Sequence, residues 1–312
     1  MPCLSTVSRT CPTYYPTCVR KTSVYLPDSL KRQLGALAER THRSEADLLR
    51  SGVEQMVEGY RDSLTIDHDP PVPGRLVGVG VGPGAADLLT VRGLRAVRRA
   101  TAVVAPCTDV TATGRAEAIV REAAPDVDVE RLVFAMTTDD AARAAALAAA
   151  ADHVAARLSG GDEVAFVTLG DPNLYSTFSS VAALVAERRL GTTVVTVPGV
   201  MAFQELAARS GTVLADDQQS FLVLPANDAG VLADGGALPA ALADESRTVV
   251  VYKGGRHVAG VAERLRSAGR LDDAVLGELL GLPGERIAPV AEAGDRPASY
   301  LSAVIVPARV DR

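Results

Sequence analysis

The sequence predicts an α/β protein with two α/β domains that follow a small N-terminal module. Three observations support this fold class. After about residue 75, short apolar stretches of strand character alternate with helix-like stretches, as in a parallel sheet with helical crossovers. A second set of strand-like runs begins after Pro198. The segment 67–74 (DHDPPVPG) is rich in proline and turn-forming residues, which is typical of a linker.

Composition and charge limit the classes of function. The 312-residue chain is 47% hydrophobic and 22% charged, which is ordinary for a globular protein. Its net charge of -6 argues against a surface devoted wholly to nucleic acid, although one basic face is compatible with it. No apolar run approaches the roughly 18–20 residues that span a bilayer. The first twenty residues lack the apolar core of a signal peptide, so we expect a cytoplasmic protein without a membrane partner.

The elements of the two α/β domains are predicted from apolar runs. In the first domain the expected strands are 76–81, 101–106, 164–169 and 193–198, and the expected helices are 87–99, 139–158 and 179–189. In the second domain the expected strands are 221–226, 248–254 and 300–308. The run 164–169 (VAFVTL) is short, apolar and rich in branched residues, which predicts a central strand. The expected divisions are a disordered tail over 1–19, a module over 20–60, a linker over 61–74, and α/β domains over 75–198 and 199–312.

Two turns with glycine follow predicted strands. Gly170 and Pro172 end the strand 164–169 and hold Asp171 at its carboxyl end, where open α/β sheets bind ligands. The alternative is that Asp171 only caps the next helix. The other turn, GVGVGPGAADLLT, resembles a dinucleotide loop, but Pro83 interrupts the glycine spacing. The strand 101–106 also lacks a final acidic residue for a ribose diol. The alternative there is that the glycines, Gly80, Gly82 and Gly84, only permit close packing.

Taken in order, the stretches GVGPG…LLT, GDPNLYSTF, VPGVMAF, VVYKGGR and YLSAVIVP resemble the tetrapyrrole methylase family. Within that family they are most similar to the precorrin-2 C(20)-methyltransferase branch of cobalamin biosynthesis. The resemblance covers about residues 75–310. It implies a two-domain α/β homodimer with S-adenosyl-L-methionine as cofactor. It also implies methyl transfer to carbon 20 of a tetrapyrrole, precorrin-2 or its cobalt form.

The resemblance also implies roles for individual residues. The implied cofactor contacts are Pro83, Leu169, Gly170, Asp171, Leu174, Met201, Ala202, Lys253 and Leu280. The implied catalytic residues at the tetrapyrrole are Tyr175, Ser176 and Thr177, and the implied contacts to substrate carboxylates are Lys253 and Arg256. None of the three hydroxyls is a natural base at neutral pH. His153 and His257 are interpreted as surface histidines, and no metal site is expected, because the N-terminal cysteines match no ligand spacing.

One loop departs from the family pattern. Relatives read GPGDPELLT, whereas Ala85 and Ala86 replace the Asp-Pro pair here. The aspartate of relatives is a candidate proton acceptor, and Asp87 is displaced by two residues from its place. An alternative function therefore stays open: a DNA-binding regulator that senses a corrinoid or S-adenosylmethionine through a catalytically impaired methylase-like domain.

The N-terminal pattern is different. Thr22, Val24 and Leu26 alternate with polar neighbours as in a half-buried strand, and Ser44 with Asp47 resembles a helix start after an earlier helix. This segment resembles a ribbon–helix–helix module. A single strand with two helices cannot close a core alone, so pairing with a second copy is expected. The implied DNA contacts are Lys21, Ser23 and Tyr25. Because the local excess of basic residues is small, a dimerisation arm without DNA binding is the alternative.

Overall fold

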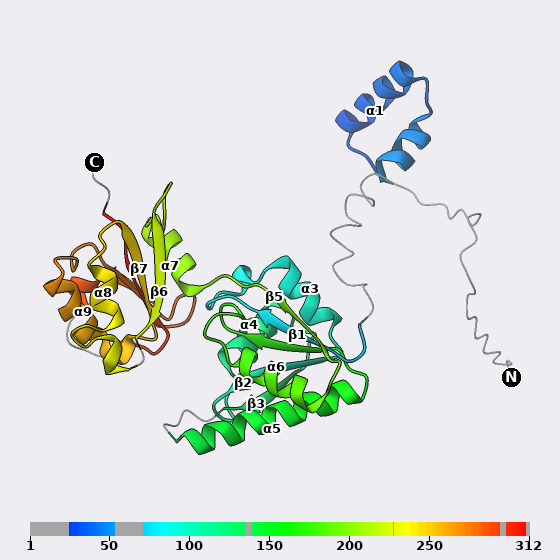
Figure 1. The fold of residues 1–312 in the computed structure, drawn as a ribbon. Helices are drawn as coiled ribbons and strands as arrows, with labels where there is room; N and C mark the ends of the chain where they lie inside the picture. The colour runs from blue at the N-terminus through cyan, green and yellow to red at the C-terminus, as the bar shows by residue number, and fades with distance from the viewer. Residues whose placement is uncertain (1–24, 54–70, 135–138, 227, 294–297, 310–312) are drawn as a thin grey trace. The chain divides into compact units, whose positions relative to one another are not determined.

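The structure is a computed structural model that describes residues 25–53, 71–134, 139–226, 228–293 and 298–309. The chain divides into two compact units, Met1–Thr65 and Ile66–Arg312, which are described separately (Figure 1). Within the described ranges, no helix has both the length and the apolar character of a membrane span.

The described part of the first unit, residues 25–53, contains two short helices. α1 spans Asp28–Thr41, and a second helix covers residues 45–53. The predicted start of the second helix is confirmed, because the Ser44 hydroxyl accepts a hydrogen bond from the Asp47 backbone N–H at 3.1 Å and donates one to the Asp47 carboxylate at 2.7 Å. The predicted strand lies mostly outside the described residues, as do Lys21 and Ser23. Tyr25 is described; it lies outside regular secondary structure and is 97% exposed.

The first sheet of the second unit has five parallel strands in the order β3-β2-β4-β1-β5. Their bounds are Arg75–Gly80 (β1), Ala102–Cys107 (β2), Val129–Val133 (β3), Val164–Thr168 (β4) and Thr193–Val197 (β5). The prediction of a central strand at 164–169 is confirmed, because β4 pairs with β1 and β2 and buries every residue. The edge strand β3 was not predicted; it is only partly buried, and its central Glu-Arg pair interrupts the apolar pattern.

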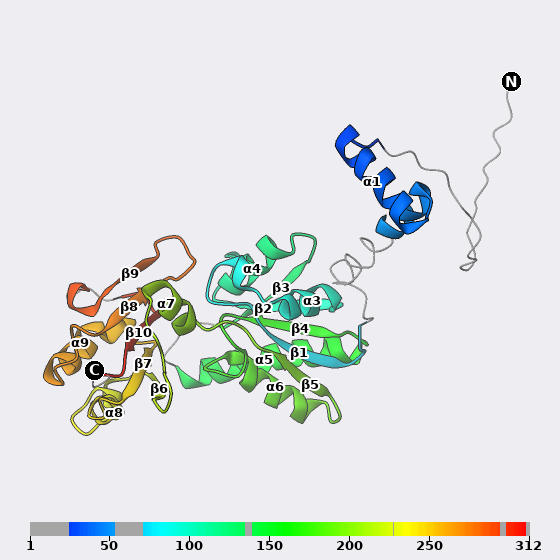
Figure 2. The ribbon, with the colours of Figure 1, turned by 90° about the horizontal axis from the view of Figure 1, so that it is seen from above.

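Helices cover both faces of this sheet (Figure 2). α3 (Val91–Arg99) and α4 (Arg115–Ala123) pack on one face, and α5 (Asp140–Ser159) and α6 (Thr177–Arg188) pack on the other. A short 3₁₀ helix, η2 (Ala86–Leu88), precedes α3, so the helix expected from Asp87 is in fact two pieces. The residue that caps α6 is Ser176, which accepts a hydrogen bond from the Phe178 N–H at 3.1 Å, so the interpretation of Asp171 as a helix cap is wrong.

The second sheet is mixed and has the order β6-β7-β10-β8-β9. Its strands are Ser220–Pro225 (β6), Arg247–Tyr252 (β7), Val275–Glu278 (β8), Arg286–Pro289 (β9) and Ser302–Val306 (β10). β6 and β7 are parallel, and the other pairs are antiparallel. The sequence predicted β6, β7 and β10 but not β8 and β9. Each missed strand has four residues, which is too short for a clear alternation of polar and apolar side chains.

Alternating side chains of β7 build two cores. Val250 faces α7 (Ala202–Ser210), whereas Val249 and Val251 face α8 (Ala237–Leu242) and α9 (Val258–Ser267). The remaining short elements are the 3₁₀ helices Ala229–Val231 (η3), Gly255–His257 (η4) and Val290–Glu292 (η5). The predicted α/β class with two sheets is therefore confirmed.

Candidate active site

The turns after β1, β4 and β5 meet at the carboxyl edge of the first sheet. Gly170, with a φ of 65°, donates its N–H to the Gly82 carbonyl at 2.8 Å. The Asp171 carboxylate accepts hydrogen bonds from the Asn173 N–H at 2.8 Å and from the Gly199 N–H at 3.1 Å. Asp171 thereby ties the turn after β4 to the turn after β5, and backbone donors occupy its carboxylate.

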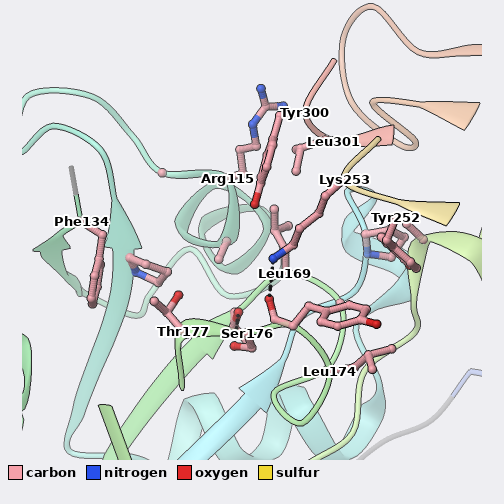
Figure 3. Close-up of a pocket in the computed structure, with 18 of the residues that line it drawn as sticks. Arg115, Phe134, Leu169, Leu174, Ser176, Thr177, Tyr252, Lys253, Tyr300 and Leu301 are labelled. Carbon is pink, nitrogen blue, oxygen red and sulfur yellow. Dashed lines mark hydrogen bonds between the residues drawn. The ribbon is translucent and has the colours of Figure 1, made fainter. Parts of the chain in front are cut away.

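A pocket of about 970 Å³ opens beside these turns and is lined by residues of both sheets (Figure 3). This volume lies at the upper end of the ~300–1,000 Å³ range of small-molecule sites. The predicted site residues that line it are Pro83, Leu169, Gly170, Leu174, Tyr175, Ser176, Thr177, Met201, Ala202, Lys253, Arg256 and Leu280. The fold thus brings residues as far apart in the sequence as Pro83 and Leu280 to one cavity. Asp171, Ala85 and Asp87 are not among the described lining residues.

The loop after β1 packs directly on the second sheet's loop at Leu280. A Cβ added to Gly84 would overlap the carbonyl oxygen of Leu280, so only glycine permits this backbone contact. Leu280 itself is 4% exposed, and its neighbour Leu279 has a positive φ of 50°. This contact holds one wall of the pocket in place.

Lys253 and Tyr175 contact each other in another wall of the pocket. Both are non-glycine residues with positive φ, 57° and 52°, and such strain clusters at functional sites. The Lys253 ammonium donates to the Tyr175 carbonyl at 3.2 Å (Figure 3, dashed line). It also lies 5.5 Å from the centre of the Tyr175 ring and 5.9 Å from that of Tyr300, which gives two cation–π contacts. Among the described residues, Lys253 has no carboxylate partner.

The hydroxyl groups of the site are largely engaged or hard to ionise. Ser176 lies 3.0 Å from the Thr168 hydroxyl in addition to capping α6. Burial raises the pKa of Tyr175, whose hydroxyl donates to the Val223 carbonyl at 3.3 Å. Burial also raises the pKa of Tyr252 to about 12. Both phenols therefore stay protonated at neutral pH, and they can orient a ligand but are poor bases.

The pocket is positively charged although the protein is acidic. Arg115, Arg143, Lys253 and Arg256 line it, and no aspartate or glutamate is among the described lining residues; Arg143 forms an ion pair with Asp140, so Arg115, Lys253 and Arg256 supply the uncompensated charge. A cavity lined by one sign of charge concentrates ligands of the opposite sign. His257 also lines the pocket, whereas His153 lies on α5 at 2.8 Å from the Glu130 carboxylate.

Sequence reasoning missed four prominent lining residues: Arg115, Phe134, Tyr252 and Tyr300. Figure 3 shows Phe134 and Tyr252 at opposite ends of the pocket. A signal for Arg115 was available, because it follows the predicted strand 101–106 and the carboxyl ends of parallel strands carry binding loops. Phe134 carried no such signal, because β3 was not predicted.

A buried carboxylate supports the loop before α4. Glu117 is 0% exposed and accepts hydrogen bonds from Arg131 at 2.7 Å, from Arg121 at 2.8 Å and from the Gly114 N–H at 3.2 Å. The Arg131 hydrogen bonds are the main reason that the pKa of Glu117 is lowered to about 2. Glu117 is therefore ionised at all physiological pH values and holds the start of α4 in place.

Comparison with known proteins connects this site to a family. Residues 75–294 match the family model of tetrapyrrole (corrin/porphyrin) methylases. The chain belongs to the tetrapyrrole methylase family. This tetrapyrrole methylase is 33% identical over 248 residues to a precorrin-2 C(20)-methyltransferase from Sinorhizobium, which covers 77% of this chain and 97% of the relative. It is 31% identical over 238 residues to the cobalt-precorrin-2 C(20)-methyltransferase of Salmonella typhimurium, which covers 75% and 96%.

Solved structures agree with the fold of this methylase. The X-ray structure of cobalt precorrin-4 methyltransferase matches it with a TM-score of 0.57 at 20% identity, over 75% of this chain and 95% of the other. Tetrapyrrole methylases use S-adenosyl-L-methionine, so the cofactor predicted from the sequence is confirmed at the level of the family. The family match begins at residue 75, after the N-terminal unit.

Proposed function

We propose that this methylase transfers a methyl group from S-adenosyl-L-methionine to carbon 20 of precorrin-2, or of its cobalt form, in cobalamin biosynthesis. Two relatives that carry this name align with the chain over nearly their whole length. The observation that carries the proposal is the charge of the pocket. A cavity of about 970 Å³ with cations from both sheets and no described acidic side chain suits a large ligand that bears several carboxylates.

The cofactor is proposed to bind at the turn of Gly170. Leu169, Leu174 and Met201 give this turn an apolar surround, and a Cβ on Gly170 would lie 3.1 Å from the Met201 sulfur. With a φ of 65° and the Met201 side chain this close, position 170 strongly favours glycine. The backbone groups of such a turn fit the amino-acid end of S-adenosyl-L-methionine, and the apolar side chains fit its thioether carbons. When bound, this cofactor supplies an already activated methyl group.

The chain itself has to hold the substrate in line with that methyl group. Lys253 and Arg256 are proposed to bind substrate carboxylates, and Tyr175 and Thr177 to orient the macrocycle or a water molecule. Since both phenols of the site keep their protons, a positioned water is proposed to accept the proton that the methylated carbon releases.

The test is direct. Purified protein is incubated with labelled S-adenosyl-L-methionine and precorrin-2, with and without cobalt. Mass spectrometry is expected to show one added methyl group, and NMR to place it on carbon 20. A methyl group at another ring position would reassign the enzyme within its family, and the cobalt comparison identifies the preferred form of the substrate.

The second candidate is a regulator that senses a corrinoid or S-adenosylmethionine without catalysis. Ala85, where relatives have aspartate, favours it. Binding of both ligands without any methylated product in the same assay would support the sensor and exclude the enzyme.

The N-terminal unit is proposed to pair with a second copy as a ribbon–helix–helix module, with Lys21, Ser23 and Tyr25 toward DNA. α1 buries none of its residues, and the exposed fractions of Leu30, Leu37 and Val53 are 48%, 43% and 54%. Apolar side chains on a helix pair this small need a partner to be covered, which supports dimerisation of the chain.

A further inference from the structure

Arg115 differs from the arginines around it. It is the first residue of α4 and lines the pocket, as Figure 3 shows. Arg121, on the same helix, and Arg131, on β3, both form ion pairs with Glu117 at 2.7–2.8 Å. Arg115 is exposed and has no ion-pair or hydrogen-bond partner among the described residues. Its charge is therefore available to a ligand in the pocket.

The backbone that carries Arg115 is rigid. The Glu117 side chain accepts the Gly114 N–H at 3.2 Å, and the Gly114 carbonyl accepts the Ala118 N–H at 2.9 Å, so the first turn of α4 is held from both sides. Arg131 also donates to the Val110 carbonyl at 2.6 Å, which fastens the loop before the helix. A cation on such a support needs little reorganisation to meet an anion.

Arg115 and Lys253 come from different walls. Arg115 follows β2 of the first sheet, whereas Lys253 and Arg256 follow β7 of the second sheet. In Figure 3 the charged ends of Arg115 and Lys253 point in opposite directions. A ligand with one carboxylate can pair with only one of these walls. A macrocycle with carboxylates around its rim can pair with both, and two contacts at separate points prevent it from rotating in its own plane.

We propose that Arg115 is a specificity-determining residue that binds a rim carboxylate of the substrate, and that Arg115 and Lys253 together set which carbon faces the methyl donor. This inference rests on the proposed function, because it takes the substrate to be a macrocyclic polycarboxylate. It adds a recognition point on the first sheet to the contacts proposed for the second.

The first experiment measures binding alone. The probe is uroporphyrin, an octacarboxylate porphyrin, and its own visible fluorescence reports binding because no protein side chain emits in that range. Arg115→Gln in the full-length protein is expected to weaken porphyrin affinity roughly 5- to 30-fold, as for the loss of one partly exposed charge-assisted hydrogen bond. Arg115→Lys should recover part of the loss. S-adenosylhomocysteine affinity, measured by calorimetry, should not change.

The matched control is Arg95→Gln. Arg95 is an exposed arginine of α3 that has no ion pair among the described residues and does not line the pocket. Its replacement removes the same charge from the protein and is expected to leave porphyrin affinity within twofold. Circular dichroism melts of all variants exclude a folding defect as the cause.

The outcomes separate the two proposals. If the wild-type protein binds uroporphyrin and Arg115→Gln binds it equally well, the role of Arg115 is overturned and the proposed function stands. If the wild-type protein binds S-adenosylhomocysteine but no porphyrin at low salt, the proposed substrate class is wrong and both proposals fall.

With precorrin-2, Arg115→Gln is expected to raise KM more than it lowers kcat and to yield a fraction of product methylated away from carbon 20. A single product with unchanged KM would also overturn the inference.

Discussion

A carboxylate oxygen of Asp171 lies 3.1 Å from the backbone nitrogen of Gly199 and accepts its hydrogen bond. The second oxygen accepts the Asn173 N–H at 2.8 Å. One side chain thus connects the turns after two strands that both flank β1 in the sheet. Because Gly170 and Leu174 of the first turn line the pocket, Asp171 acts on the site through the backbone that it holds.

Asp171→Ala is expected to weaken cofactor binding by about 1–3 kcal/mol, because two backbone N–H groups lose their acceptor and the turn loosens. Calorimetric titration with S-adenosylhomocysteine measures the change. Asp87→Ala is the control, since Asp87 is exposed and outside the described lining of the pocket. Equal affinities of wild type and Asp171→Ala would remove Asp171 from the support of the cofactor site.

Gly84→Ala is expected to destabilise the protein by on the order of 1–3 kcal/mol and to weaken cofactor binding, because the new methyl group overlaps the Leu280 carbonyl. Urea unfolding and calorimetry measure the two effects. In the control Gly260→Ala, on α9, the methyl group meets only the flexible end of Leu232, and alanine favours a helix. If Gly84→Ala were as stable as this control, the two loops would not be in close contact.

The ionised Glu117 side chain is expected to stabilise the folded protein, and this stabilisation is expected to disappear at acid pH. Its pKa is lowered from 4.5 to about 2 in the folded protein, chiefly by the Arg131 hydrogen bonds. A lowered folded-state pKa stabilises the fold above pH 4.5, and this contribution is lost as the pH falls from about 4.5 to about 2. Glu117→Gln should therefore be less stable than wild type at pH 7, and the difference should shrink toward pH 3. Urea midpoints at pH 7, 4 and 3 measure it; a difference that does not change with pH would contradict the assignment.

Removal of residues 1–65 is expected to leave methyl transfer largely intact, because the unit Ile66–Arg312 contains both sheets and every described residue that lines the pocket. Labelled-methyl transfer by the shortened and full-length proteins is the comparison. A loss of activity greater than about tenfold, with the shortened protein still folded, would show that the N-terminal unit contributes to the site.

DNA binding by the N-terminal unit is expected to be weak and sensitive to salt, because the local excess of positive charge is small. Gel shifts on the DNA upstream of the protein's own operon compare wild type with a Lys21→Ala/Tyr25→Ala double variant, and only the wild type should bind. If neither protein shifts DNA at low salt while the unit still dimerises in ultracentrifugation, the unit is an assembly device.

Much of the fold could be predicted because the responsible signals are local. β4 and β7 are runs of branched apolar residues that lie between neighbouring strands, so the sequence shows their burial directly. The cap at Ser44 and the long helix α5 likewise depend on residues within a few positions of one another. The order of the motifs also predicted the family and therefore the cofactor, because these motifs lie in turns whose residue identities are typical of the family.

Other features were decided only by the tertiary structure. β3 lies at a sheet edge and β8 has four residues, so their pairing depends on neighbours that are distant in sequence. The sequence predicted that Asp171 lies at the carboxyl edge of the sheet, where ligands bind. Only the packing of the turns brings the Gly199 N–H to its carboxylate. The sequence places Arg115 after a predicted strand, but it does not show that the charge of Arg115 is unpaired; that follows from the fold, in which Glu117 pairs with Arg121 and Arg131. Local pattern determines elements, whereas the partners of a charged side chain depend on which distant elements the fold brings within about 4 Å of it.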